Sequence, residues 1–198
     1  MVRQRQRFRG RIAGVGTTSG IRVVVGRWHD SPLGSFGDAM VERADGHRVL
    51  VAPNQAVADF IAATYTFDEV RVEHMVITGE TTWQVRSPSL MLDLEVGGRT
   101  LLGHLLRLVP RRVAEAPWWC AVTDLVARLV LRGVRTRGDT GDRREWYGAT
   151  DHHRLRAASG SFDGAPLGSL RPVQPTHFGF SSTPSAPSVT TVVTTVGF

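Results

Sequence analysis

Two carboxylates lie where a β-strand could present them to an enclosed site. Asp38 follows a glycine-containing turn and begins an apolar strand. If its side chain points inward, it can act as a general acid or base, or bind a ligand hydroxyl. Glu42, four residues further on, would share that strand face, because alternate residues of a strand point the same way. The alternative is that Asp38 is an outward-facing turn carboxylate.

A second candidate cluster combines arginines with a glutamate and two aromatic residues. Strand alternation places Arg135 and Arg137 on one face of one predicted strand, and Glu145 and Tyr147 on one face of the next. Guanidinium groups offer paired planar donors that suit a carboxylate or a phosphate. If these faces point inward, the cluster, with Trp146 beside it, would select a small carboxylate or carbonyl compound. If they point outward, they form a salt-bridged exterior that adds little stability.

The composition excludes several other kinds of chemistry. The chain has no lysine, so neither Schiff-base catalysis nor the lysine of a phosphate-binding P-loop is available. No glycine-rich phosphate fingerprint opens a predicted helix, and no Gly-x-Ser-x-Gly turn occurs, which argues against nucleotide cofactors and serine hydrolysis. The single cysteine, Cys120, cannot form an internal disulfide, and we expect it to be a small buried apolar residue.

The histidines do not predict a metal site. His152 and His153 are adjacent, and adjacent residues of a strand point to opposite faces, so their imidazoles cannot easily bind one ion. The remaining histidines are scattered through the sequence. We therefore expect no metal ion and no other cofactor.

Positive charge is concentrated at the N-terminus. The net charge is +6, and five of the positive charges alternate along the first eleven residues, at Arg3, Arg5, Arg7, Arg9 and Arg11. A basic strand of this kind could follow phosphates and bind nucleic acid in a salt-dependent way. Because no aromatic platform or recognition-helix pattern accompanies the arginines, we favour a solvated terminus or a charged edge strand. Nucleic acid is thus the least favoured partner.

Most segments have the pattern of short strands that would position these candidates. The hairpin signal Asp45-Gly46 joins two apolar runs, and a helix is expected after Asn54, over residues 56–64. A short helix is expected near 111–116, a helix is slightly preferred over a strand at 121–130, and residues 166–187 are predicted to be mainly loop. The expected strands cover residues 8–15, 21–28, 35–43, 47–52, 69–76, 82–96, 100–108, 134–137, 144–150, 153–159 and 188–196.

About ten short strands and few helices predict a mainly β, β-rich α+β protein. We expect a closed or nearly closed antiparallel β-barrel with one or two short helices, formed by a single domain over residues 1–198, with 1–7 as a basic terminus that can fray. A barrel of this size can enclose one small ligand or be filled by side chains. No apolar run is long enough to cross a bilayer and no secretory signal is visible, so we expect a soluble cytoplasmic protein with no membrane partner.

One region resembles the acetoacetate decarboxylase-like superfamily. The similar residues are the turn and strand Ser31–Asp38, the strand residues Val49–Val51, the helix start Asn54–Ala58 and the segment Ala62–Phe67. Their order and spacing are similar to those of the family over about 40 residues, from about 31 to 68. The resemblance implies a cone-shaped β-barrel with a small-molecule pocket, often in an oligomer.

The departures from the family pattern restrict the chemistry. Thr66-Phe67-Asp68 stands where the family has its Schiff-base lysine, Asn54 stands where it has a second glutamate, and Asp38 takes the position of the first. Decarboxylation through an imine is therefore unavailable, and any activity would have to be a different one.

The leading hypothesis from the sequence is a β-barrel that binds a small organic acid or carbonyl metabolite, with homo-oligomerisation possible. Any catalysis would be acid–base chemistry on a carbonyl or carboxylate compound. The alternatives are a structural or interaction protein with a filled barrel, and weak nucleic-acid binding. The residues predicted as catalytic are Asp38 and Glu145, and those predicted to bind the ligand are Arg135, Arg137, Tyr147, Asn54 and Trp146.

Overall fold

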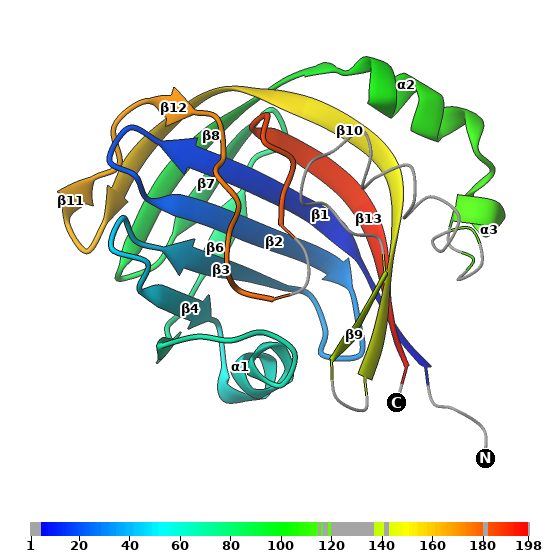
Figure 1. Ribbon diagram of the computed structural model, residues 1–198, viewed down its shortest axis with the longest axis horizontal. Coiled ribbons are helices and arrows are strands. Elements are labelled where there is room, and N and C mark those ends of the chain that lie inside the picture. Colours follow the sequence, from blue (N-terminus) through cyan, green and yellow to red (C-terminus); the bar gives the residue numbers. More distant parts are fainter. Residues whose placement is uncertain are drawn as a thin grey trace.

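The computed structural model describes residues 5–114, 116, 119, 137–140, 143–179 and 182–197 of the chain. Most of these residues form one curled sheet, a half-barrel with few short helices (Figure 1), which confirms the predicted mainly β fold class. The elements in chain order are β1 (Arg5–Thr17), β2 (Arg22–Asp30), β3 (Phe36–Glu42), β4 (Arg48–Ala52), α1 (Gln55–Ala62), β5 (Glu69–Val72), β6 (Val76–Thr78), β7 (Thr82–Arg86), β8 (Leu90–Arg99), α2 (Leu101–Leu108), α3 (Arg111–Ala114), β9 (Arg137–Thr140), β10 (Arg143–Phe162), β11 (Ala165–Pro166), β12 (Leu170–Arg171) and β13 (Ser188–Gly197).

The strand order brings the two ends of the chain together in the middle of the sheet. It runs β5-β4-β3-β2-β1-β13-β10-β8-β7-β6, while β9 and β11 pair with β10 and β12 pairs with β1. Among the described strands, β4 and β5 form the parallel pair, and α1 is the crossover between them. In Figure 1, α1 accordingly lies below the sheet beside β4.

The two faces of the sheet pack against different partners. Odd-numbered residues of β2 and β3, such as Val25 and Val41, pack with Leu92 of β8 in the main apolar core. Even-numbered residues, such as Met40 of β3 and Leu50 of β4, point to the opposite face and pack with α1. This period-two alternation is what the sequence predicted, and it places Asp38 on the face under α1.

Helix α1 begins at a side-chain cap. Asn54 has an extended backbone, and its Oδ1 accepts a hydrogen bond from the Val57 backbone N–H at 3.0 Å. Val57, Ala58 and Ile61 lie at helical spacing and are buried against the sheet. The helix expected after Asn54 is confirmed.

The strand expected at residues 100–108 is wrong, because that segment is α2. Thr100 caps the helix, since its Oγ1 accepts from the Gly103 N–H at 3.1 Å. Leucine has a high helix propensity, and the leucines that follow Thr100 repeat at helical rather than strand spacing. The predicted short helix near 111–116 is present as α3.

Several strand boundaries differ from the expected ones. The strands expected at 144–150 and 153–159 are one long strand, β10, whose register against β13 shifts between Ala149 and Asp151. The segment 82–96 splits into β7 and β8 around a turn closed by the Ser87 N–H donating to the Leu90 carbonyl. The segment 69–76 likewise divides between β5 and β6. The helix weighed at 121–130 lies outside the described residues.

The N-terminal arginines belong to the sheet from Arg5 onward. β1 pairs with β13 from Arg5 to Gly14, so residues 5–7 lie within the sheet. Arg9 forms an ion pair with Asp30 at 2.8 Å, and Arg11 forms one with Glu80 at 2.8 Å. Part of the basic stripe is therefore neutralised within the protein.

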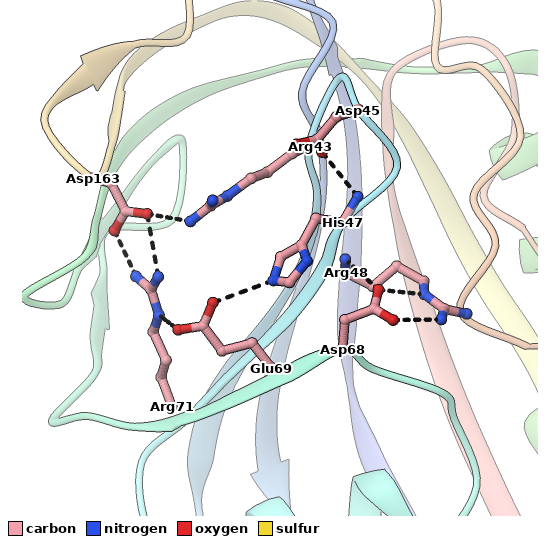
Figure 2. A network of polar contacts seen from close by, with 8 residues as sticks. All are labelled: Arg43, Asp45, His47, Arg48, Asp68, Glu69, Arg71 and Asp163. Atoms are coloured by element: carbon pink, nitrogen blue, oxygen red, sulfur yellow. Dashed lines mark hydrogen bonds and ion pairs between the residues drawn. The ribbon is translucent and has the colours of Figure 1, made fainter.

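A network of ion pairs joins distant segments at one rim of the half-barrel (Figure 2). Arg71 of β5 donates to both carboxylate oxygens of Asp163, which lies in the turn after β10, and Arg43 donates to the same carboxylate at 2.6 Å. Both guanidinium groups also lie over the Phe162 ring, each at 5.4 Å from its centroid. The network therefore ties the turn after β10 to β5 and to the β3–β4 hairpin.

A second part of this network holds the start of β4 to the segment before β5. Arg48 donates through Nε and Nη2 to the two carboxylate oxygens of Asp68, both at 2.9 Å (Figure 2). These hydrogen bonds hold the pKa of Asp68 well below its usual value. Glu69 lies between His47 at 3.3 Å and Arg71 at 2.7 Å.

Within the described residues, no helix has the length and apolar character needed to cross a membrane.

Candidate functional site

A cavity lies between the sheet and helix α1, on the face opposite to the main core. Its volume is about 70 Å³, and its lining comes from β1, β2, β3, β10 and β13 together with α1 and the turn that follows it. A buried water needs roughly 10–15 Å³ on this measure, so the cavity has room for about five waters or one small organic molecule. The lining residues are Phe8, Ile12, Val24, Gly26, Trp28, Phe36, Asp38, Met40, Phe60, Ile61, Thr64, Tyr65, Glu145, Tyr147, Thr194 and Val196.

Asp38 is positioned by a tryptophan and by two glycines that leave room for the indole. The Trp28 Nε1–H donates to Asp38 Oδ1 at 2.8 Å. A Cβ on Gly26 would lie 2.3 Å from Asp38 Oδ1 and 2.5 Å from Trp28 Nε1, and a Cβ on Gly10 would lie 2.7 Å from Trp28 Cε3. The indole therefore rests against backbone that carries no side chain, and its N–H reaches the carboxyl across Gly26.

The environment of Asp38 favours its protonated form. Burial raises the pKa of Asp38 from 3.8 to about 6, although the hydrogen bond from Trp28 acts in the opposite direction. The residue is only 4% exposed. A carboxyl that changes charge near pH 6 can both accept and release a proton close to neutral pH, as a general acid or base must.

Opposite the tryptophan, two tyrosines and a glutamate form a hydrogen-bonded cluster. The Tyr147 hydroxyl donates to Glu145 Oε2 at 2.7 Å, and the Tyr65 hydroxyl lies 3.1 Å from the same oxygen. The two hydroxyls are also hydrogen-bonded to each other. Glu145 and Tyr147 lie two residues apart on β10 and therefore point to the same face, whereas Tyr65 reaches them from the turn after α1.

Both phenols are held in their neutral, hydrogen-bond-donating form. Burial raises the pKa of Tyr65 and of Tyr147 well above the usual value, and the negative charge of Glu145 adds to the effect. The charge of Asp38 also raises the pKa of Tyr65, so the two polar groups of the cavity are close enough to interact. Neutral phenols in a buried site are donors for a ligand oxygen.

Thr194 adds a polar atom that the described residues leave unsatisfied. Its Oγ1 is buried and finds no hydrogen-bond partner among the residues that the structure describes. Thr194 is directly opposite Tyr147 in the β10–β13 pair and also lines the cavity. A buried hydroxyl without a partner costs free energy, and a ligand oxygen in the cavity would remove that cost.

Aromatic and aliphatic side chains form the rest of the walls. Phe8 of β1 packs on Phe60 of α1 with ring centroids 4.7 Å apart, and on Trp28 edge-to-face at 6.1 Å. Phe36 lies 6.3 Å from Trp28 on its other side. These walls keep most water away from Asp38 and strengthen the electrostatic interactions inside.

The structure brings together three of the residues selected from the sequence. Asp38, Glu145 and Tyr147 all line the cavity, although Asp38 comes from β3 and the other two come from β10. Glu42, which shares the face of Asp38, is instead buried in contacts with Arg22 at 3.0 Å and His177 at 2.7 Å, and does not line this cavity.

The other selected residues lie elsewhere. Asn54 is the cap of α1, and its side chain is used in the hydrogen bond to Val57. Trp146 points away from Glu145 and Tyr147, because neighbouring strand residues alternate, and Arg5 lies over its ring at 5.9 Å. Arg135 lies outside the described residues, and only the backbone of Arg137, paired with Trp146, is described.

The sequence analysis missed Tyr65 and Trp28. Tyr65 lies in a turn, where the periodicity of the sequence does not indicate which way a side chain points. A signal was nevertheless present, because the chain has only two tyrosines and both meet in this cavity. Trp28 comes two residues after Gly26, which pairs with Asp38, so the side chains of Trp28 and Asp38 share one face of the sheet. Only the pairing of β2 with β3 makes that proximity visible.

The described residues contain no group of three histidine, cysteine, aspartate or glutamate side chains that could hold a metal ion. Comparisons of the chain with protein-family models, with curated proteins and with solved structures find no match. The site is therefore interpreted from its own geometry.

Proposed function

We propose that the chain binds a small, uncharged organic molecule with a carbonyl group in the cavity under α1. The observation that carries the proposal is the pairing of a buried carboxyl, Asp38, with a buried phenol cluster on the walls of one apolar cavity. Sites for small molecules are typically apolar with a few polar groups that fix the orientation of the ligand.

The phenol cluster is the part that suits a carbonyl oxygen. The Tyr65 contact to Glu145 is the longer of the two, at 3.1 Å against 2.7 Å for Tyr147, so the Tyr65 hydroxyl is the one that can turn to a ligand. Thr194, which pairs with Tyr147 in the sheet, provides a second donor through Oγ1. A ketone or aldehyde oxygen would satisfy both groups, while the carbon chain packs on the aromatic walls.

The charges in the lining disfavour an ionised acid as the ligand. The cavity lining includes the carboxyl of Asp38, whose described hydrogen-bond partner, Trp28, is a neutral donor. Burial already raises the pKa of Asp38, so a ligand carboxylate beside it would place a second negative charge in an environment that disfavours the first, which costs free energy. The carbonyl class is thus preferred over the organic acids that the sequence analysis also considered.

The test compares a neutral ligand with a charged one of similar size. Butan-2-one and butanoate are titrated into isotopically labelled protein at pH 8, and the Trp28 indole N–H resonance is followed by NMR. We expect a saturable shift with butan-2-one and binding of butanoate at least tenfold weaker. Thr194→Val, which keeps the side-chain shape, should weaken butan-2-one binding several-fold.

Asp93→Asn is the matched control, because Asp93 lies on β8 in an exposed ion pair with Arg86 and outside the cavity. This variant should bind butan-2-one as the parent does. If the Trp28 resonance does not respond to butan-2-one at any concentration, the proposed function is wrong.

A further inference from the structure

Building on the proposed function, we infer that this cavity catalyses proton transfer at the carbon next to the ligand carbonyl, by way of an enolate. The inference rests on Asp38 of β3 and the phenol cluster lining one small cavity, with Asp38 hydrogen-bonded to Trp28 and not to the phenols. It specifies a reaction for the site in addition to binding.

Such a reaction needs two groups placed on different sides of the substrate. A base must reach the proton on the α-carbon, and hydrogen-bond donors must stabilise the negative charge that develops on the oxygen. The base and the donors must not be hydrogen-bonded to each other, because each would then neutralise the other.

Asp38 has the features of the base. Trp28 occupies Oδ1, and the described residues give Oδ2 no hydrogen-bond partner, so this oxygen is available to the cavity that the residue lines. The hydrogen bond from Trp28 fixes the orientation of the carboxyl group. Burial makes the ionised carboxylate a stronger base than an exposed one, since it raises the pKa of Asp38 to about 6.

The phenol cluster and Thr194 have the features of the oxyanion donors. Tyr65 and Tyr147 remain protonated at neutral pH, because burial and the charge of Glu145 raise the pKa of both. Tyr147 donates to Glu145 at 2.7 Å, and the Tyr65 hydroxyl contacts both groups. For catalysis the Tyr65 proton turns from this cluster to the substrate oxygen, where its hydrogen bond strengthens as negative charge develops.

The step is balanced without any further reactant. The Asp38 carboxylate takes the α-proton, the C–H electron pair becomes the C=C bond of the enolate, and the C=O π pair moves to the oxygen. Tyr65 and Thr194 donate hydrogen bonds to that oxygen. The reverse step returns a proton from Asp38 to carbon, and the carbonyl forms again.

The charge of Asp38 determines the pH dependence. Only the ionised carboxylate can accept the proton, so the rate should rise as the pH increases through about 6 and then level off. Trp28, which holds Asp38, does not titrate. The other titratable groups in the described lining are Tyr65 and Tyr147, whose raised pKa keeps them neutral over this range, and Glu145, whose negative charge contributes to raising the pKa of both.

The experiment measures exchange of the α-protons of butan-2-one for deuterium. The protein is incubated with butan-2-one in D₂O between pD 5 and 8, and the loss of the α-proton signals is followed by NMR, alongside the Trp28 binding titration. We expect exchange above the buffer rate, at least 100-fold slower with Asp38→Asn and about tenfold slower with Tyr65→Phe. Asp93→Asn should exchange at the parent rate.

The outcomes separate the two proposals. Exchange that depends on Asp38 and follows the expected pH profile supports both. Saturable binding without exchange above the buffer rate overturns the catalytic inference and leaves the binding function in place. Exchange that persists in Asp38→Asn, with binding intact, also overturns the assignment of the base. Absence of binding overturns both proposals together.

Discussion

Asp38 and Asp68 are the same residue type in opposite environments. Asp68 lies at the rim in a bidentate pair with Arg48, which lowers its pKa, whereas Asp38 lies under α1 beside a tryptophan, and burial raises its pKa to about 6. Both accept hydrogen bonds. The difference is that one partner carries a positive charge and the other does not.

This contrast separates the polar groups that hold the fold together from those that are poised to react. At the rim, the carboxylates of Asp68, Glu69 and Asp163 each have a guanidinium partner. In the cavity, Asp38 has only a neutral donor among the described residues. A carboxylate paired with a guanidinium group is stabilised in its ionised form and does not readily take up a proton. A buried carboxylate without a cation is high in free energy, so it takes up a proton more readily.

The largest expected effect comes from removing the charge of Asp38. In the folded protein its pKa is about 6, against 3.8 for the unfolded chain, so between these values the folded state binds a proton that the unfolded state does not. The free energy of unfolding should therefore fall as the pH rises from about 4 to 6, by up to about 3 kcal/mol. Asp38→Asn should remove this decline and be the more stable protein at pH 8, as measured by urea denaturation.

The matched variant for this measurement is Asp93→Asn, whose parent carboxylate lies in an exposed ion pair. It should keep the decline between pH 4 and 6. If Asp38→Asn shows the same pH dependence as the parent, the environment assigned to Asp38 is wrong.

The next largest change in the free energy of unfolding is expected when a side chain fills the space at Gly26. Gly26→Ala puts a methyl group where Asp38 Oδ1 and Trp28 Nε1 lie, 2.3 and 2.5 Å from the added carbon. We expect a loss of about 2 kcal/mol in the free energy of unfolding and a changed Trp28 fluorescence spectrum. Gly34→Ala is a useful control for space, because no atom lies within 4 Å of a Cβ there, although its positive φ adds a small cost of its own. Equal fluorescence spectra for Gly26→Ala and the parent would contradict the proposed contact.

Removing one phenol hydroxyl from the cluster should cause an intermediate loss of stability. Tyr147→Phe takes away the 2.7 Å donor to Glu145 while keeping the ring in place. A hydrogen bond to a charged group contributes about 1.5 kcal/mol at the lower end of its range, and the thermal midpoint should fall accordingly. Tyr65→Phe removes the longer contact and should cost less stability. The opposite order would mean that Tyr65, and not Tyr147, fixes the position of the glutamate.

The smallest effect is expected at the rim. Asp163→Asn weakens the contacts to Arg43 and Arg71, both partly exposed, and should lower the free energy of unfolding by less than about 1 kcal/mol. The loss should shrink further in 1 M salt, because exposed ion pairs are screened. A salt-independent loss larger than that of Tyr147→Phe would show that the rim, rather than the cavity, has the stronger polar contacts.

Which residues share a strand face was the most predictable property of the chain. Period-two alternation correctly put Glu145 with Tyr147 on one face of β10, whereas it left open which way the Asp38 side chain points. The Asp45-Gly46 hairpin and the Asn54 helix start were also visible, because each depends on a local backbone requirement. Local signals are sufficient where local geometry decides the structure.

The set of residues that meet in the cavity could not be predicted, because it depends on pairing between strands that are distant in the sequence. Nothing near Asp38 in the sequence indicates that β13 and β10 follow β1 in the sheet, and only this order brings Tyr147 and Asp38 into one cavity. Asn54 was selected for its family position, but the backbone of α1 uses its side chain. The leucines of α2 were interpreted as a strand although their spacing is helical, because a short apolar segment between predicted strands is easily assigned to the wrong element.

Helix α1, which covers one side of the cavity, is held at both ends because it connects β4 to β5. One end of α1 continues from β4, and the other leads through Tyr65 to Asp68 and Arg71, which are tied to the rim. A ligand too large for the cavity would displace α1 and so strain the ion pairs of Asp68 and Arg71. Because salt screens partly exposed ion pairs, we expect the binding of such a ligand to depend on ionic strength.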